Sequence, residues 1–512
     1  MERTFGTAQD PEAVSTVRRH ASTSLPSSSR VPSPYPSFNR WFLLLGALLY
    51  ITAAWFGVGH YSEDEFHQVL LVSEHLLGHV DAPALAQEYH LQWRSMVQPL
   101  LGAGAMEVCE ALGITDPFQL TFVLRLLTAM LALWVTHGFI RSVQAILEVE
   151  NKQAFTLVSY FLWFIPVLQI RFTGEAWSGL LFLRGLGMLI DPRERKAWAI
   201  GAWFGAAVIF RPAAALLPMG AVLWMLLVQH ASWKRVAQLV APAVSILVIG
   251  GAVDSFIYGH PVSTLWNYII AGLTGQEAER FTSLPWYQYA LFTVKHAVVP
   301  IGVLIILAFA TLLLLRPKHL LIWTIGPFLL VHSMVAVKEV RFLFPLAPLI
   351  PWLLIAAWEA LQKRWPTMMA RTIWLRVLFA ISVVNAAALL TGITTPAGNG
   401  KIKLAQAIQD RFGSDPVHID YLGSERQWIP PFYLSPKRTE RFTDRIIVDP
   451  AVNGPVHLVI ANQSLDLDRM ANLERMATAT PPWTDRFLRW YGLEDGHDPL
   501  VLYHVTTQTI GH

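Results

Sequence analysis

The sequence is poor in charged residues and almost free of cysteine. Only 15% of the 512 residues are charged and 54% are hydrophobic, whereas soluble domains carry about 25% charged residues. Cys109 is the single cysteine, which excludes internal disulfide bonds and a cysteine-based metal cage. The shortage of charge indicates a membrane protein. The net charge of +3 is small and spread between apolar runs, which fits membrane orientation better than nucleic-acid binding.

Common binding and catalytic motifs are also missing. The sequence contains no GxGxxG, P-loop or GxSxG motif. His75 and His79 have the spacing of a helical metal pair, but no flanking glutamate completes a zinc-enzyme motif, so we expect no metal. No apolar segment lies at the extreme N-terminus. We therefore expect no cleavable signal peptide, and the first apolar run must act as the first anchor.

Long apolar runs are what the chain has instead. A spanning helix needs about 20 predominantly apolar residues, and about eleven segments approach that length. They are residues 41–58, 121–147, 155–170, 177–190, 197–210, 213–227, 237–257, 293–315, 320–335, 342–358 and 374–390. A shorter apolar stretch, 100–114, is expected to form a helix lying in the membrane interface. The expected fold class is a polytopic α-helical membrane protein.

The distribution of apolar runs along the chain predicts three domains. Residues 1–36 are rich in Ser, Pro and Arg and are expected to be a disordered cytoplasmic tail. Residues 37–395 form the transmembrane module, with a first outer loop at 60–119. Residues 396–512 hold no spanning segment and are expected to be a soluble α/β domain. Its predicted elements are a helix at 401–412 and strands at 417–421, 445–448, 456–461 and 500–505.

The positions of Lys and Arg predict the orientation. Short loops on the cytoplasmic side of a membrane are enriched in basic residues. With a cytoplasmic N-terminus, the short inner loops hold Arg193, Arg195, Lys196, Lys234, Arg235, Arg316, Lys318, Lys363, Arg364 and Arg371. An odd number of spans then places the C-terminal domain outside. Most of the unusual polar residues fall on that same side, so an active site at the outer surface is expected.

Three consecutive carboxylates, Glu63, Asp64 and Glu65, directly follow the first span. A carboxylate can deprotonate a sugar hydroxyl if it is oriented and its neighbours adjust its pKa. The alternative is a solvated acidic loop, which is common. The predicted orientation favours the catalytic interpretation, because it places these acids with the other unusual polar groups.

Cations near the ends of the spans form the second candidate set. Lys338 and Arg341 lie at an outer surface against the usual charge bias, which suggests an anionic ligand such as a lipid phosphate. The alternative is a charge-balanced network with Glu339. Three further arginines lie at outer positions: Arg94, Arg171 and Arg211.

Each of these further arginines also has an ordinary explanation. Arg94 follows Trp93 and can be a snorkelling arginine of the aromatic belt. Arg171 can form a surface ion pair with Glu175, worth little. Arg184 lies in the middle of a predicted span, where an arginine is a functional hypothesis by default, although it can also pair with a buried acid such as Asp254.

Taken in order, these segments resemble the lipid-dependent mannosyltransferases that include the GPI-anchor and N-glycan-precursor α-mannosyltransferases, which share the GT-C architecture. Asp64 and Glu65 match the last two positions of a His-Pro-Asp-Glu motif. Further matches, within residues 41–393, are Arg94-Ser95 with Pro99, Arg211-Pro212, Asp254-Ser255, Tyr258-Gly259, Asn267, Pro285-Trp286, Tyr289 and Lys338-Glu339-Val340-Arg341-Phe342-Leu343. The first motif lacks its His and Pro, and Val337 replaces a His in the last. These departures point to a divergent member, in a bacterial inner membrane or the endoplasmic reticulum membrane.

The resemblance implies transfer of a hexose, most simply mannose, from dolichyl or another polyprenyl phosphate to a lipid-linked glycan or glycolipid at the outer or luminal face. The reaction inverts at the anomeric carbon, with Asp64 as the general base and Glu65 assisting. Lys338 and Arg341 would bind the donor phosphate, with Arg94, Arg171 and Arg211 in reserve. Glu63, Glu175, Asp254, Tyr258 and Trp286 are the expected substrate-binding residues. The expected partners are membrane lipids and these substrates, with no nucleic acid, and neither a metal nor a nucleotide cofactor is implied.

Two alternatives remain open. One is an enzyme of the same architecture with another sugar or a cell-envelope acceptor. The other is a lipid or glycolipid transporter, which should show internal symmetry and polar residues near mid-membrane. We find no internal repeat with a period of about 20–50 residues, and the polar residues gather at one face, which disfavours transport.

Overall fold

The structure is a computed structural model that describes residues 36–191, 193, 196–274, 283–398, 400–423, 428–444, 456–470, 472–490 and 499–506. Residues 42–512 form one compact unit. The predicted tail, apart from residue 36, and the predicted strand 445–448 lie outside the described residues.

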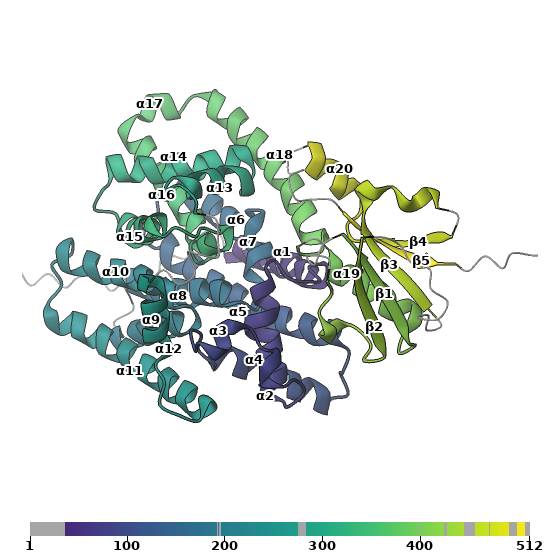
Figure 1. The fold of residues 1–512 in the computed structure, drawn as a ribbon. Coiled ribbons are helices and arrows are strands. Elements are labelled where there is room, and N and C mark those ends of the chain that lie inside the picture. The colour runs from purple at the N-terminus through teal and green to yellow at the C-terminus, as the bar shows by residue number, and fades with distance from the viewer. Residues whose placement is uncertain are drawn as a thin grey trace, which may run out of the picture. The chain divides into compact units, whose positions relative to one another are not determined.

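Helices make up most of residues 36–394 (Figure 1). The longer ones are α1 (Pro36–Phe56), α4 (Val97–Ala111), α5 (Pro117–Gln144), α6 (Lys152–Phe161), α8 (Gly174–Ile190), α9 (Ala197–Phe210), α10 (Leu216–Leu227), α11 (Trp233–Tyr258), α12 (Thr264–Thr274), α14 (Val299–Leu315), α15 (Leu320–Met334), α16 (Ile350–Arg364) and α18 (Thr372–Thr394). Shorter helical segments are η1 (Glu65–Leu70), α2 (Leu71–Leu76), α3 (Gln87–His90), α7 (Phe164–Gln169), η4 (Pro212–Ala215), α13 (Gln288–His296), η5 (Val340–Leu349) and α17 (Pro366–Met369).

Four helical segments among the described residues are long and apolar enough to cross a membrane: Pro117–Gln144, Trp233–Tyr258, Val340–Arg364 and Thr372–Thr394. The pair α14 and α15 adds a fifth if it is one span, bent by 118°. Shorter apolar helices lie at Arg40–Phe56, Ala197–Phe210 and Pro212–Leu227. These helices support a multi-pass membrane protein, while the count of about eleven spans stays a prediction.

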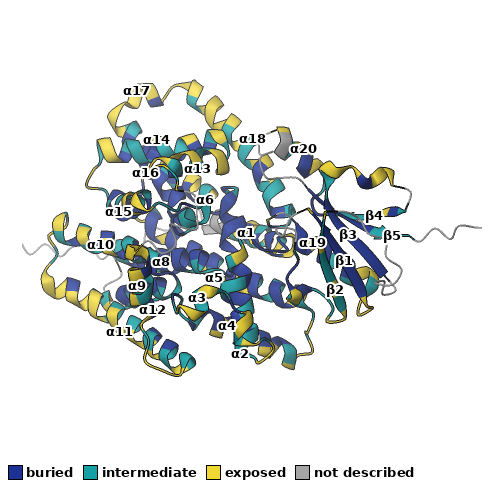
Figure 2. Cartoon of the chain, in the orientation of Figure 1, coloured by how far each residue is buried: buried dark blue, intermediate teal, exposed yellow. Residues whose placement is uncertain are grey.

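The burial pattern of the long helices agrees with a lipid environment. Figure 2 shows exposed residues along much of α11, whereas α8 is mostly buried. Only 6% of the apolar window of α18 and 17% of that of α11 is buried. Apolar surfaces of this extent are rare on soluble monomers, and they fit contact with lipid acyl chains.

Small residues allow the helices to pack closely. A Cβ atom at Gly201 of α9 would lie 1.8 Å from the carbonyl oxygen of Leu239 of α11, and one at Gly205 would lie 2.5 Å from that of Ala243. Glycine at both positions therefore lets the two backbones touch, as is common between membrane helices. The N-terminus of α5 is capped by Asp116, whose carboxylate accepts from the amides of Phe118 (2.8 Å) and Gln119 (2.9 Å).

The C-terminal residues fold as a five-stranded sheet with helices. The strand order is β2-β1-β3-β5-β4, with β1 (Val417–Leu422) parallel to β2 (Arg438–Thr443) and β3 (Val456–Asn462). β5 (Leu500–Val505) runs antiparallel to β3 and to β4 (Leu473–Thr478). α19 (Lys401–Phe412) shares a buried core with β1 and β3, and α20 (Pro482–Trp490) follows β4. The predicted helix 401–412 and strands 417–421, 456–461 and 500–505 are confirmed, whereas β2, β4 and α20 had not been predicted.

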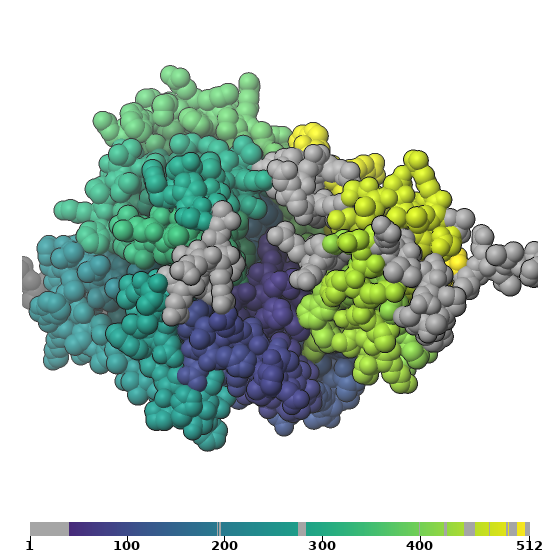
Figure 3. Space-filling model, viewed as in Figure 1, coloured from purple at the N-terminus to yellow at the C-terminus, as the bar shows by residue number. Residues whose placement is uncertain are grey.

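The segment after α1 joins the helical part to this sheet. Val58, Phe66 and Leu70 belong to the same buried cluster as Ile402 of α19 and Ile419 of β1. Figure 3 shows this purple segment bordered on one side by teal helices and on the other by the C-terminal sheet. The three predicted acids therefore lie where the two parts of the chain meet.

Candidate active site

A backbone hydrogen bond and aromatic packing hold in place the residues just before the three acids. The backbone amide of Ala397 donates to the carbonyl of Val58 (2.9 Å). The ring of His60 packs at a tilt between the rings of Phe66 and Tyr433, with centroid distances of 5.6 Å to each. The helical segment η1 then begins at Glu65, so the three acids occupy successive positions around one helix start and point in different directions.

Asp64 is brought together with the predicted cation Arg341. Their side chains form an ion pair, and Asp64 also accepts a hydrogen bond from Gln68. Arg341 holds Glu339 as well, donating from Nε over 2.6 Å and from Nη2 over 3.0 Å. Gln68 donates in addition to Glu88. The first and last predicted motifs therefore meet, in a cluster that is partly open to solvent.

Glu65 points elsewhere and is buried. Its Oε2 accepts from the amide of Tyr61 (3.0 Å), and its Oε1 lies 3.7 Å from Nη1 of Arg171. Arg171 is only 3% exposed and also donates to the carbonyl of Gly59 (2.8 Å). Burial raises the pKa of Glu65, although the Arg171 guanidinium opposes this effect. Glu65 and Arg171 thus hold the turn that presents Asp64.

A second ion pair, between Arg211 and Glu175, lies next to the pair of Asp64 and Arg341. Arg211 Nη1 is 2.6 Å from Glu175 Oε1, and both side chains are buried. The Phe342 ring lies 5.2 Å from the guanidinium carbon of Arg211 and 5.5 Å from that of Arg341. The surface pair of Arg171 with Glu175, the ordinary alternative for Arg171, is not found: Arg171 lies beside Glu65, and Glu175 pairs with Arg211. Burying an ion pair costs free energy that only good geometry repays, which marks this pair as more than a surface contact.

Arg94 completes the cluster from the segment before α4. It lies 3.5 Å from Glu88 and 5.5 Å above the Tyr268 ring. The buried carboxylate of Asp254 fixes this segment, since it accepts from Ser95 Oγ (2.9 Å), the Met96 amide (2.7 Å) and Thr264 Oγ1 (2.6 Å). Asp254 is therefore not the partner of Arg184, which lies over Trp134 at 5.0 Å.

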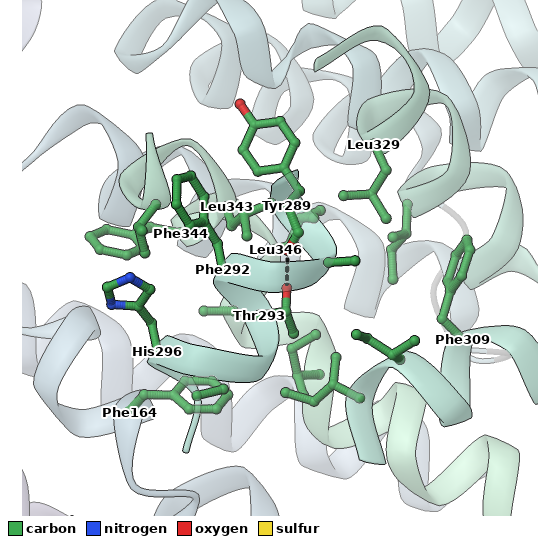
Figure 4. Close-up of a pocket in the computed structure, with 18 of the residues that line it drawn as sticks. Phe164, Tyr289, Phe292, Thr293, His296, Phe309, Leu329, Leu343, Phe344 and Leu346 are labelled. Carbon is green, nitrogen blue, oxygen red and sulfur yellow. Dashed lines mark hydrogen bonds between the residues drawn. The ribbon is translucent and has the colours of Figure 1, made fainter. Parts of the chain in front are cut away.

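An apolar cavity of about 530 Å³ adjoins the cluster (Figure 4). Tyr61 and Val340 line it, and these residues lie three and one positions before Asp64 and Arg341 in the chain. Its walls come from α7, α13, α14, α15 and η5 and include Phe164, Phe292, Phe309, Leu329, Leu343 and Phe344. Trp286, 73% exposed, lies at its edge. We call this cavity the apolar groove.

Three other predicted site residues are engaged by protein groups. Lys338 donates from Nζ to the carbonyls of Leu284 (2.8 Å) and Val335 (2.5 Å), and burial lowers the pKa of its ammonium. Glu63 pairs with Lys401 of α19 (2.7 Å). The ring of Tyr258 packs on that of Tyr89. These contacts place the three residues around the cluster of Asp64 and Arg341, and none of the three contacts that pair directly.

Sequence reasoning missed Gln68 and Glu88. Gln68 follows Asp64 by four residues, the spacing that puts two side chains on one helix face, so this signal was present in the sequence. Glu88 accepts hydrogen bonds from Gln68 and Arg94. The folded chain brings these residues together, and no local sequence pattern indicated a role for Glu88.

Among the described residues, one group has ligand atoms close enough for a metal ion: His418, Asp420 and His457, all buried on neighbouring strands. The Asp420 carboxylate already faces four nitrogens, His418 Nε2 (3.2 Å), His457 Nε2 (2.8 Å) and two of Arg441 (2.7 Å each). A carboxylate offers about four lone-pair sites. Burial alone would raise the pKa of Asp420, but His457 and Arg441 outweigh it and hold that pKa well below its usual range. We assign this cluster as a charge-assisted network that stabilises the sheet.

The fold defines the class of protein. The chain is similar to the crystal structure of ArnT from Cupriavidus metallidurans bound to undecaprenyl phosphate, with a TM-score of 0.55 and 13% identity over 93% of this chain and 99% of that one. The apo form of the same protein gives a TM-score of 0.50 and 12% identity over 91% and 97% of the two chains. The fold is that of the GT-C glycosyltransferases, as the sequence predicted.

Residues 40–411 match the Alg9-like mannosyltransferase family, and the chain belongs to that family. It is 24% identical to the GPI alpha-1,2-mannosyltransferase 3 of Danio rerio over 303 residues, 56% of this chain and 53% of that protein. It is also 24% identical to the GPI mannosyltransferase 3 of Yarrowia lipolytica over 310 residues, 59% of this chain and 58% of that protein. The matches thus span little more than half of these relatives. The chain is a divergent member of this family, and its apolar helices support a multi-pass membrane protein.

Proposed function

We propose that the protein transfers mannose from a polyprenyl-phosphate mannose to a hydroxyl group of a lipid-linked glycan. The observation that carries the proposal is the contact of Asp64 with Arg341 beside the apolar groove. Three features thus lie together. Asp64 can accept a proton, Arg341 can bind a phosphate, and the apolar groove is suited to an isoprenoid chain. The family supports mannose as the sugar, and the ArnT structure with undecaprenyl phosphate shows that the fold can bind such a lipid.

In the proposed reaction the isoprenoid chain occupies the apolar groove and its phosphate lies beside Arg341. Asp64 accepts the proton of the acceptor hydroxyl, whose oxygen attacks the anomeric carbon as the bond from that carbon to the phosphate oxygen breaks. Polyprenyl phosphate leaves with the bonding electrons, and the configuration inverts. A lipid phosphate is an adequate leaving group once cations stabilise its developing charge, so one base and this cation supply the essential chemistry.

The two acids of the motif take different roles in this proposal. Asp64 is partly exposed and contacts the cation expected at the donor phosphate, whereas Glu65 is buried against Tyr61 and Arg171. A general base must reach the acceptor hydroxyl directly, which favours Asp64. Glu65 then positions the turn, and the pair of Glu175 with Arg211 forms a second wall for the substrate.

The packing of the C-terminal sheet supports the proposed sidedness. Phe66 shares a buried core with Ile402 and Ile419, and Glu63 pairs with Lys401. The acids and the C-terminal domain must therefore lie on one side of the membrane. Together with the basic inner loops, this supports an active site on the periplasmic or luminal side.

The direct test is a transfer assay with purified protein, radiolabelled polyprenyl-phosphate mannose and a panel of lipid-linked acceptors. We expect transfer by the natural protein and a fall of roughly 10²–10⁴-fold in Asp64→Asn, the range that a general base contributes. Asp415→Asn, an exposed acid in the C-terminal domain, is the matched control and should transfer normally. Equal transfer by Asp64→Asn would refute the assignment of the base, and no transfer from any polyprenyl donor would refute the proposed reaction.

A further inference from the structure

Tyr289, at the second position of α13, has a buried hydroxyl group without a hydrogen-bond partner among the described residues. The side chain is only 4% exposed. Buried polar groups nearly always have a partner, so an orphaned hydroxyl needs an explanation. In an enzyme, a ligand that binds at this place is a natural one.

The ring of Tyr289 is held in place. It packs against the rings of Phe292 (6.2 Å between centroids) and His332 (6.4 Å). The Tyr289 carbonyl accepts from Thr293 Oγ1 (2.8 Å). Figure 4 shows this hydrogen bond and the Tyr289 hydroxyl pointing away from Thr293 and His296. The hydroxyl is therefore presented in a fixed direction, at little further entropic cost on binding.

The surroundings of this hydroxyl connect the apolar groove with the charged cluster. Tyr289 lines the groove. Burial raises the pKa of its phenol, the Glu339 carboxylate raises it further and the Arg211 guanidinium opposes this. Glu339 is the partner of Arg341, and Arg211 is the partner of Glu175. The phenol is thus in electrostatic reach of a member of each ion pair, and it stays protonated and able to donate.

We propose that Tyr289 donates a hydrogen bond from its hydroxyl to the phosphate of the polyprenyl-phosphate donor, where the apolar groove meets the ion pairs. This inference rests on the proposed function, and it adds a neutral donor to the cationic side chains around the phosphate. Such a donor stabilises the charge that develops on the leaving phosphate. Sequence reasoning had quoted Tyr289 only as part of a motif and gave it no role.

The test compares Tyr289→Phe with the natural protein in detergent, because this change removes the hydroxyl and keeps the ring. The first measurement is the affinity for polyprenyl phosphate without a sugar, and the second is kcat/KM for polyprenyl-phosphate mannose. We expect both to fall on the order of tenfold or more, the usual effect of losing a hydrogen bond to a charged group. The matched control is Tyr503→Phe, a buried tyrosine of β5 whose hydroxyl donates to Asp468 (3.0 Å), and it should leave both values unchanged.

Thermal stability separates a binding role from a structural one. Removing an unpaired buried hydroxyl leaves the melting temperature of the unliganded protein unchanged or higher. Unchanged affinity for polyprenyl phosphate in Tyr289→Phe would overturn the proposal, as would a lower melting temperature that accounts for the loss. A loss seen only with the mannose-bearing lipid would overturn it in favour of a contact to the hexose. If the natural protein binds polyprenyl phosphate but transfers no mannose, the reaction proposed above fails while the affinity measurement still decides the role of Tyr289.

Discussion

Two regions of this protein place a carboxylate beside an arginine, and they use the pair in different ways. In the C-terminal sheet, Asp420 faces four nitrogens from His418, His457 and Arg441. In the cluster of Asp64 and Arg341, the carboxylate meets one guanidinium and one amide, and both residues are partly exposed. Among the described residues, buried polar atoms without a partner occur in both regions: the Tyr289 hydroxyl and Arg94 Nε near this cluster, and in the sheet Nδ1 of His457, the ring nitrogen that does not contact Asp420.

The difference shows how a stabilising network can be distinguished from a binding site. A carboxylate whose lone pairs are all used gains nothing from a ligand, so such a cluster stabilises the fold. A carboxylate with free lone pairs, next to unpaired donors, still has interactions to offer. The comparison therefore predicts that changes in the first region alter stability and that changes in the second alter activity.

The largest effect is expected for Arg341→Gln. Arg341 both orients Asp64 and, in the proposed reaction, stabilises the leaving phosphate, so its loss should lower kcat/KM by about 10³-fold, the upper range for one electrostatic contact. The melting temperature should change little, because the side chain is partly exposed. Arg438→Gln, which removes a similar partly exposed pair with Glu440 on β2, is the control. If kcat/KM of Arg341→Gln stays within threefold of that of the natural protein, the distinction between the two regions is wrong.

Asp420→Asn should show the opposite pattern. It removes the charged acceptor that Arg441, His418 and His457 share, which should destabilise the sheet by about 3 kcal/mol. Transfer activity per folded molecule should stay the same. Thermal unfolding in detergent measures the first quantity, and the transfer assay normalised to folded protein measures the second. The matched control is Asp466→Asn, whose pair with Arg469 is exposed and worth less than about 1 kcal/mol.

A smaller effect is expected for Gln68→Leu. The Gln68 amide donates to both Asp64 and Glu88, and without it the two carboxylates repel each other and Asp64 is less well oriented. We expect about a fivefold fall in kcat/KM, equivalent to about 1 kcal/mol. Gln406→Leu, on α19, is the control. A fall in melting temperature without a fall in kcat would place Gln68 with the stabilising network instead.

The sequence predicted those features that depend on local patterns. Apolar runs indicated the membrane helices, and the amphipathic pattern of 401–412 predicted α19 with the bounds that the structure shows. β2 was missed because its sequence, Arg438–Thr443, holds three charged residues and only one large apolar side chain. Within the described part of the chain it is an edge strand that pairs only with β1, and edge strands carry such charges.

The site could be predicted as a set of residues but not as a set of pairs. Asp64 and Arg341 were both singled out, yet their contact joins segments that only the fold brings together. The same holds for Glu63, whose partner Lys401 begins α19. A surface pair of Arg171 with Glu175 was the ordinary alternative, because the two residues are close in sequence. In the fold, Arg171 lies beside Glu65 and Glu175 pairs with Arg211, and both contacts are buried.

The last and smallest effect is on the pH dependence of local stability, where the two regions should again differ. Burial raises the pKa of Glu65 in the folded protein, so its ionisation weakens the fold around it at higher pH, and this cost disappears as the pH falls to the ordinary carboxyl value. The pKa of Asp420 is lowered, so its stabilisation is complete above the ordinary value of about 4 and is lost as the pH falls below it. The histidines of both regions also titrate: His60 and His67 in the acidic segment and His418 beside Asp420 have lowered pKa values, so both regions also weaken as the pH falls below about 6.5. Comparison with variants therefore isolates each carboxylate in hydrogen exchange corrected for intrinsic rates. From pH 7 to 4, residues 61–70 should lose more protection in Glu65→Gln than in the natural protein. Below pH 4, β1 should lose less additional protection in Asp420→Asn than in the natural protein. Identical pH profiles of each variant and the natural protein would contradict the distinction between the two regions.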